Sequence, residues 1–152
     1  MRAKATPPGY HTLNPILWVP DAAAALDFYK AAFDATEDFR REMQGRLLVA
    51  VILIGDSRLM ISDLRNDPDR VGAGLARSDV LELKIYVDDV DAVFRRAIEQ
   101  GATQAETVGD KYFGERSGAL VDPFGFTWRL AEFLEDIPHQ EIERRMREAA
   151  RG

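Results

Sequence analysis

The sequence predicts an α+β fold made of two related modules and a C-terminal helix. First, a strand, a helix and a hairpin follow one another twice in the same order, over residues 10–64 and 80–135. Second, matching residue types recur about 68 positions apart. Third, one Asp-, Gly- and Pro-rich stretch, Arg65 to Gly74, separates the two copies. Since 152 residues suit one domain, we expect both modules to form a single domain over residues 1–152.

The first module is expected to begin with a strand over residues 13–19, where the pattern alternates with a period of two. Pro15 favours a sheet edge or a strand start there. Asp21 should cap the helix that follows, and residues 46–54 and 58–62 form a hairpin around a Gly-Asp-Ser turn. The side chains expected between the helix and the sheet are Leu13, Leu17, Val19, Ala22, Ala25, Leu26, Tyr29 and Phe33.

The second module repeats this plan. Residues 81–87 alternate as a half-buried strand, Asp89 should cap a helix, and Gly101 stands where a left-handed residue can end that helix. Residues 117–133 give two strands around an Asp-Pro-Phe-Gly turn. The expected core side chains are Leu83, Ile85, Val87, Val90, Val93, Phe94, Ala97 and Ile98.

The offset between the modules is nearly constant. Asp21 matches Asp89 at 68 positions, and Met60 falls opposite Arg129 at 69. A period that holds across strand, helix and hairpin indicates a duplication.

The last predicted element is a helix over residues 138–150, with Pro138 in its first turn. Ile142, Met146 and Ala149 make a thin apolar stripe, and Glu141 and Glu143 precede arginines by four residues in the favourable order. We expect a solvated, salt-bridged helix; the alternative is a dimer contact.

Composition excludes several classes of protein. The chain has no cysteine, which removes disulfides, thiolate nucleophiles and cysteine-ligated metals. A net charge of -6 disfavours a nucleic-acid partner, and no 18-residue apolar run suits a membrane span. The first residues lack the apolar core of a signal peptide, so a cytoplasmic location is expected.

Three segments carry a family resemblance: GYHTLNPILWVPDAAAALDFYKAAFDA, YVDDVDAVFRRAIEQGA and ERSGALVDPFGFTWRLAE. They resemble the vicinal-oxygen-chelate superfamily of glyoxalases, bleomycin-resistance proteins and extradiol dioxygenases, and most of all its PhnB-like branch. The resemblance runs from about Gly9 to Glu135. It implies two βαβββ modules whose strands curve into a cup for small ligands, usually in a homodimer.

The resemblance also locates the usual metal ligands, which are His or carboxylate side chains near the start of each module's first strand and in its last strand. These positions fall on Asn14, Met60, Glu82 and Arg129. A divalent site usually takes three or more such ligands, and only Glu82 qualifies. We therefore expect no metal cofactor, and an ion pair between Glu82 and Arg129 in its place.

Other positions support a metal-free cup. His and Glu often stand in PhnB-like relatives at the places of Val49 and Val51, which with Leu53 should give an apolar floor. His11 and His139, the two histidines, lie outside the strands expected to build the cup.

We expect the cup to bind a small, partly aromatic or anionic molecule. Tyr112 and Arg116 lie in the loop KYFGERSG, where the resemblance puts a wall of the site; alternatively Tyr112 closes the core and Arg116 pairs with a nearby acid. The candidate ligand-binding residues are Asn14, Trp18, Glu82, Tyr86, Tyr112, Arg116 and Arg129. No catalytic residue is assigned.

Two other functions stay open at this stage. One is a lyase, isomerase or dioxygenase that uses a divalent metal held by other residues or by a partner subunit. The other is an antibiotic-sequestering resistance protein, for which an acidic surface would favour cationic drugs. The family hosts too many chemistries for its fold to choose among them.

Overall fold

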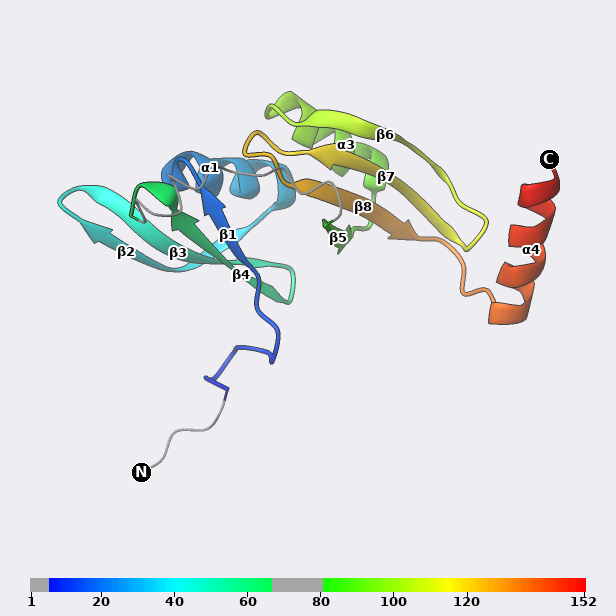
Figure 1. Cartoon of the computed structure of the whole chain (residues 1–152), viewed down its shortest axis with the longest axis horizontal. Helices are drawn as coiled ribbons and strands as arrows, with labels where there is room; N and C mark the ends of the chain where they lie inside the picture. Colours follow the sequence, from blue (N-terminus) through cyan, green and yellow to red (C-terminus); the bar gives the residue numbers. More distant parts are fainter. Residues whose placement is uncertain (1–5, 67–80) are drawn as a thin grey trace. The chain divides into compact units, whose positions relative to one another are not determined.

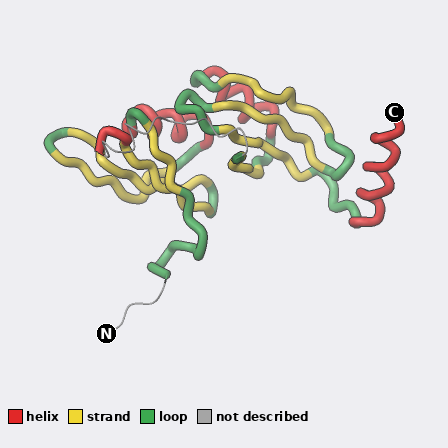
Figure 2. Tube along the Cα trace, viewed as in Figure 1, coloured by secondary structure: helices red, strands yellow, loops and turns green. Residues whose placement is uncertain are grey.

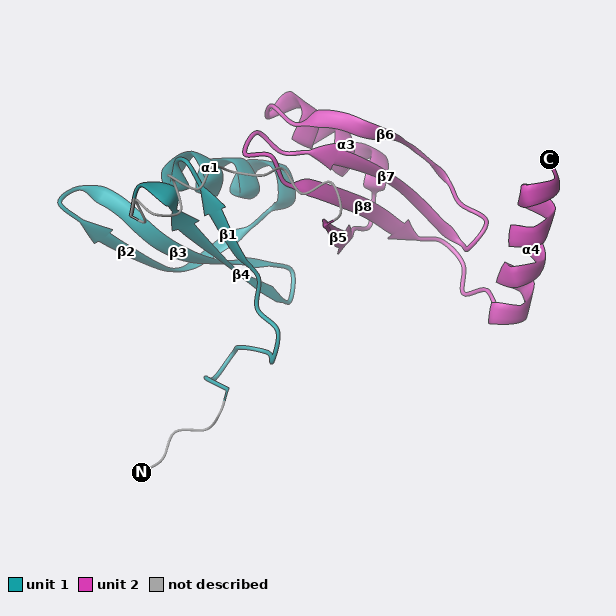
Figure 3. Cartoon of the chain, in the orientation of Figure 1, with its two compact units in different colours: residues 1–76 teal, residues 77–152 magenta. Residues whose placement is uncertain are grey.

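The computed structural model describes residues 6–66 and 81–152, so most of the predicted linker, from residue 67 onward, lies outside the described residues. The chain divides into two compact units, residues 1–76 and 77–152 (Figure 3). Each described unit holds one four-stranded mixed sheet, which confirms the α+β class.

The first unit contains β1 (Ile16–Val19), α1 (Ala22–Phe33), β2 (Thr36–Met43), β3 (Arg46–Ile54), β4 (Ser57–Asp63) and the short 3-10 helix η1 (Leu64–Asn66) (Figure 1). Its strand order is β1-β4-β3-β2. β1 runs parallel to β4, while the other neighbours are antiparallel. This is the βαβββ order that the family resemblance implies.

Helix α1 packs on one face of this sheet through the apolar stripe that the sequence predicts. The Asp21 carboxylate accepts a hydrogen bond from the Ala24 backbone nitrogen at 3.1 Å, which satisfies one donor that the first helical turn leaves free. The fully buried Asp63 at the end of β4 accepts from the Ala22 nitrogen, also at 3.1 Å. All five predicted helix core residues are buried: Ala22, Ala25, Leu26, Tyr29 and Phe33.

The first strand is shorter than predicted. β1 starts at Ile16, and Leu13, expected in the core, is 86% exposed. The Asn14 amide bonds the His11 carbonyl at 2.6 Å, so this segment forms a local turn and cannot continue the ladder. Pro15 marks the strand start, and β1 is an edge strand, as its proline predicts.

The second unit repeats the first with β5 (Glu82–Tyr86), α3 (Val90–Glu99), β6 (Thr103–Asp110), β7 (Glu115–Val121) and β8 (Thr127–Phe133) (Figure 2). The order β5-β8-β7-β6 matches that of the first sheet strand for strand. Asp89 caps α3 through the Ala92 nitrogen at 3.1 Å, and Glu132 bonds the Val90 nitrogen at 3.0 Å as the counterpart of Asp63. The matching strand orders and the matching hydrogen bonds at the two helix starts confirm the predicted repeat.

Three sequence expectations need correction here. Ile98, assigned to the core face of α3, is 38% exposed because it lies in the last turn. β7 begins at Glu115, so Arg116 belongs to a strand and not to the preceding loop. Residue-level patterning also missed the charged strands β2 and β6, which only the family resemblance implied.

The final helix α4 (His139–Arg151) has no buried residue. The two predicted pairs form, with 3.1 Å between Glu141 and Arg145 and 3.9 Å between Glu143 and Arg147. Arg145 also donates to the Tyr112 carbonyl at 3.4 Å, which ties α4 to the β6–β7 turn. Among the described helices, none combines the length and the apolar character of a membrane span.

Candidate functional site

The candidate site is the face of the second sheet that points away from α3, here called the open face of sheet two. Side chains alternate along a strand, so the partners of Arg129 in adjacent strands share its face. The register aligns Lys84, Arg129, Ala119 and Glu106 in one row across β5, β8, β7 and β6. Three of these four residues are charged, and the small side chain of Ala119 lies between Arg129 and Glu106.

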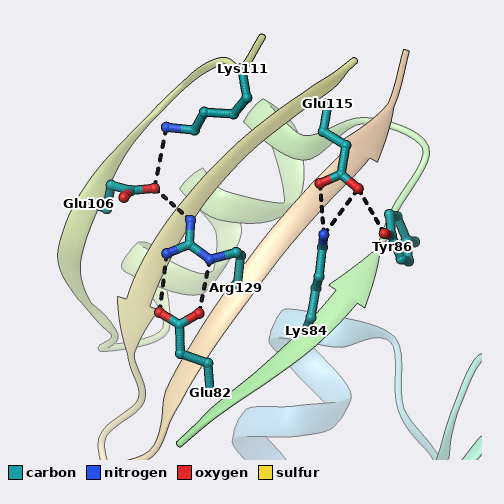
Figure 4. Close-up of polar contacts among 7 residues, drawn as sticks. All are labelled: Glu82, Lys84, Tyr86, Glu106, Lys111, Glu115 and Arg129. Atoms are coloured by element: carbon teal, nitrogen blue, oxygen red, sulfur yellow. Dashed lines mark hydrogen bonds and ion pairs between the residues drawn. The ribbon is translucent and has the colours of Figure 1, made fainter. Parts of the chain in front are cut away.

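Arg129 is the centre of the first ion-pair cluster. Its Nε and Nη2 atoms donate to the two carboxylate oxygens of Glu82 at 2.9 and 3.1 Å, and Nη1 donates to Glu106 at 2.6 Å. Lys111 approaches Glu106 at 3.4 Å (Figure 4). Two-bond pairing of a guanidinium with a carboxylate is among the stronger polar contacts in proteins. The predicted pairing of Glu82 with Arg129 is confirmed.

Glu115 is the centre of the second cluster. Lys84 Nζ lies 2.7 and 3.0 Å from its two carboxylate oxygens, and the Tyr86 hydroxyl donates to Oε1 at 2.7 Å (Figure 4). β8 lies between β5 and β7, so the Lys84–Glu115 pair crosses it. The β8 residue next to Tyr86 is Ala131, whose small side chain leaves room for this crossing.

Lys84 and Arg129 are direct neighbours in the register, and the carboxylates around them are Glu82, Glu106 and Glu115. Two like charges in that arrangement repel, and nearby carboxylates cancel the repulsion. The hydrogen bonds that Arg129 donates to the Glu82 and Glu106 carboxylates raise the pKa of Arg129 above its usual range, and the bond from Arg129 lowers the pKa of Glu106.

Glu115 and Lys84 are held ionised against burial. Burial raises the pKa of Glu115, but hydrogen bonds from Lys84 and Tyr86 outweigh it and leave that pKa below the ordinary value. Burial likewise lowers the pKa of Lys84, and its bond to Glu115 reverses the direction. The open face of sheet two is thus charged at neutral pH with its charges paired.

The equivalent row of residues in the first sheet is apolar. The matching row in the first unit is Ile16, Met60, Val51 and Phe39. The register puts Val49 and Leu53 on the face of Val51, in agreement with the predicted apolar floor. One module therefore presents aliphatic and aromatic side chains where the other presents an ion-pair network.

The structure brings together three of the seven predicted ligand-binding residues, namely Glu82, Tyr86 and Arg129, on the open face of sheet two. Trp18 lies on β1 of the first unit, beside Ser62 in the register. Asn14 precedes β1 and is engaged with the His11 backbone. Tyr112 stands in the β6–β7 turn, where its ring meets that of Phe113 edge-on.

Arg116 has a different environment. It pairs with Asp91 of α3 at 2.8 and 3.0 Å and with Asp110 at 3.0 Å. It therefore forms the contact with nearby acids that was the alternative interpretation of this residue. Lys84, Glu106 and Glu115 complete the network but were not among the candidates. The sequence predicted that Glu82 and Arg129 share this face. It could not add Glu106, because two register shifts in β6 interrupt the alternation from which the face of a residue is predicted.

The residues at the family's metal-ligand positions do not fit a divalent ion. Met60 offers a thioether, a soft donor, and Arg129 offers a cation that already binds both oxygens of Glu82. Among the described residues, no group of three or more His, Asp or Glu side chains is arranged to hold a metal ion.

Comparison with known proteins adds family relationships to this geometry. Residues 10–130 match the profile of the glyoxalase/bleomycin resistance protein/dioxygenase superfamily. An uncharacterized protein of Mycobacterium bovis is 35% identical over 141 residues, covering 88% of this chain and 91% of the relative.

Solved structures show the same fold. A glyoxalase/bleomycin resistance protein/dioxygenase family enzyme from Burkholderia phytofirmans superposes with a TM-score of 0.68 at 20% identity, over 80% of this chain and 97% of that one. A PhnB protein from Bacillus cereus superposes with a TM-score of 0.64 at 17% identity, over 80% and 99%. At these identities the likeness establishes the fold alone.

Proposed function

Because the chain belongs to the glyoxalase/bleomycin resistance protein/dioxygenase superfamily, we propose that it is a metal-independent member that binds a small, partly aromatic or anionic molecule. The binding surface is the open face of sheet two. Catalysis forms no part of the proposal.

One observation carries the metal-independent part. Arg129 stands at a position where metal-dependent relatives have a ligand, and its guanidinium holds both oxygens of Glu82, the one qualifying ligand. A divalent ion bound there would have to displace a two-bond ion pair and lie beside a fixed positive charge. The remaining positions, Asn14 and Met60, supply too little charge to offset this cost.

The small-molecule part is supported by the mixed chemistry of the face. Tyr86 is 59% exposed and lies beside Lys84, whose ammonium is 4.8 Å from the ring centre. An exposed aromatic ring next to paired cations suits a planar group with a polar or anionic substituent.

A thermal-shift screen tests this function. Native protein is screened against a library of small aromatic acids, aromatic amines and neutral aromatics, with and without excess chelator. We expect stabilising compounds whose effect is unchanged by chelator and is weakened in Tyr86→Ala. A stabilisation that depends on added divalent metal would contradict the proposal and favour a metal-dependent lyase, isomerase or dioxygenase. A library without any stabilising compound would also count against it.

We also propose that the protein forms a homodimer, as family members usually do. Sedimentation velocity on the full chain gives a direct test. A species of twice the chain mass at micromolar concentration is expected, and a purely monomeric protein would contradict this part without affecting the metal question.

A further inference from the structure

The open face of sheet two holds one polar group that the two ion-pair clusters do not use. Ser117 lies on β7 two residues after Glu115 and opposite Ala131, so it shares the face of Glu115. Its side chain is fully buried, and its hydroxyl has no hydrogen-bond partner among the described residues. An unpaired buried hydroxyl is destabilising, so its presence calls for an explanation.

The surroundings of Ser117 show what could reach it. Its neighbours in the register are Ala131 on β8 and Gly109 on β6, and Ala119 follows it on the same face. All three of these neighbours are small residues. The Lys84–Glu115 pair crosses β8, the strand whose Ala131 lies opposite Ser117.

We propose that Ser117 and Lys84 form a carboxylate subsite, and that the ligand's carboxylate takes the place of Glu115. This inference rests on the proposed small-molecule function and names the ligand class, an aromatic or heteroaromatic carboxylic acid. The Glu115 carboxylate already demonstrates that such a group fits against Lys84 and the Tyr86 hydroxyl. An incoming carboxylate gains these two donors and, in addition, the donor of Ser117.

The positive charge of Lys84 favours an anion over a cation. Its only ion-pair partner among the described residues is Glu115, and the Ser117 hydroxyl can donate one further hydrogen bond. A cation entering the same place would face Lys84 and Arg129 directly. The exposed ring of Tyr86 lies beside Lys84 and can stack on the aromatic part of the acid.

The test uses sodium benzoate as the probe, with neutral benzamide and cationic benzylamine as matched compounds, and measures affinity by protein-observed NMR titration. Wild type should bind benzoate more tightly than either analogue. Ser117→Ala should weaken benzoate binding about three- to tenfold, the range expected for one hydrogen bond. Its Tm should be equal or higher, because alanine removes an unpaired hydroxyl. Ser57→Ala removes an exposed hydroxyl in the other unit and should leave benzoate affinity unchanged.

Glu115→Gln tests whether benzoate takes the place of the Glu115 carboxylate or only binds near it. Glutamine removes the competing charge but keeps the size of the side chain, so benzoate should bind several-fold more tightly than to wild type. Unchanged benzoate affinity in both Ser117→Ala and Glu115→Gln would overturn the subsite, as would benzamide or benzylamine binding as tightly as benzoate. If benzoate fails while other library compounds bind, this inference falls and the proposed function stands. If benzoate behaves as expected in a protein that also holds metal, the metal-free proposal falls and the subsite stands.

Discussion

Arg129 on β8 and Glu82 on the neighbouring parallel strand β5 lie two residues apart in the register and join through two hydrogen bonds of 2.9 and 3.1 Å. In the first unit, Met60 corresponds to Arg129 and Asn14 to Glu82, and no charge occurs at either position. The duplication has thus produced one charged and one uncharged version of the same location. The proposal that this chain is metal-independent rests on the charged version.

Replacing Arg129 with its first-module counterpart tests how much the network contributes. Arg129→Met leaves Glu82 and Glu106 without their common partner, so we expect a loss of about 1–2 kcal/mol in the free energy of unfolding. Arg144→Met is the matched control, because Arg144 also bridges two glutamates but lies on the exposed helix α4. Its loss should be clearly smaller than that of Arg129→Met, because exposed ion pairs contribute little to stability. Equal losses in urea unfolding would contradict a special role for Arg129.

The Glu115 cluster should respond to acid in a defined direction. The pKa of Glu115 is lower in the folded protein than its ordinary value, so its contribution is present above the unfolded-state pKa and disappears as pH falls through the folded-state pKa. The stability difference between wild type and Glu115→Gln should therefore be greatest near neutral pH and shrink from about pH 5 downward. Urea unfolding of both proteins at several pH values measures it. A difference that grows on acidification would show that the pKa shift has the opposite sign.

Much of the fold follows from local chemistry that a sequence displays. Asp21 and Asp89 mark both helix starts, and the 68-residue spacing between them reflects the duplication. β2 and β6 were not visible in this way because edge strands carry charged side chains on both faces, which removes the alternation on which strand prediction depends.

The site was predictable in part. The pairing of Glu82 with Arg129 followed from the family resemblance, which puts metal-ligand positions on both residues, since an acid and a base at those positions can pair. Glu115 was assigned to a loop, so its contact with Lys84 across an intervening strand could not be foreseen. The prediction that Arg116 lines the ligand site from a loop was wrong for a related reason. Arg116 lies on β7, and its side chain points to Asp91 on α3.

A glycine in the β6–β7 turn gives a further test of the second unit. Gly114 has a φ of +89°, and an added Cβ would meet the carbonyl oxygen of Glu135. Gly114→Ala should therefore cost more than about 2 kcal/mol, through backbone strain combined with a steric clash. Gly45→Ala has a similar φ of +75° but open space, and should cost only about 1 kcal/mol. Equal thermal-denaturation midpoints for the two variants would contradict this difference.

The two carboxylates at the start of α1 should differ in how much they stabilise the protein. Asp21→Ala removes one exposed capping bond and should cost about 1 kcal/mol. Asp63→Ala removes a fully buried carboxylate that bonds both the Ala22 nitrogen and Arg65, so a loss of about 2–3 kcal/mol is expected. Chemical denaturation of the two variants compares them directly. A larger loss for Asp21→Ala would contradict the packing of β4 against the start of α1.

The central claim is that a paired arginine and glutamate replace the divalent ion of metal-dependent relatives. Its most direct test is the metal content of native, untagged protein, measured by mass spectrometry before and after anaerobic incubation with excess nickel, zinc, manganese and ferrous iron. We predict that no metal approaches one equivalent per chain under any of these conditions. A near-stoichiometric metal that survives gel filtration would contradict the claim and direct the search to metal-dependent glyoxalase, isomerase and dioxygenase reactions.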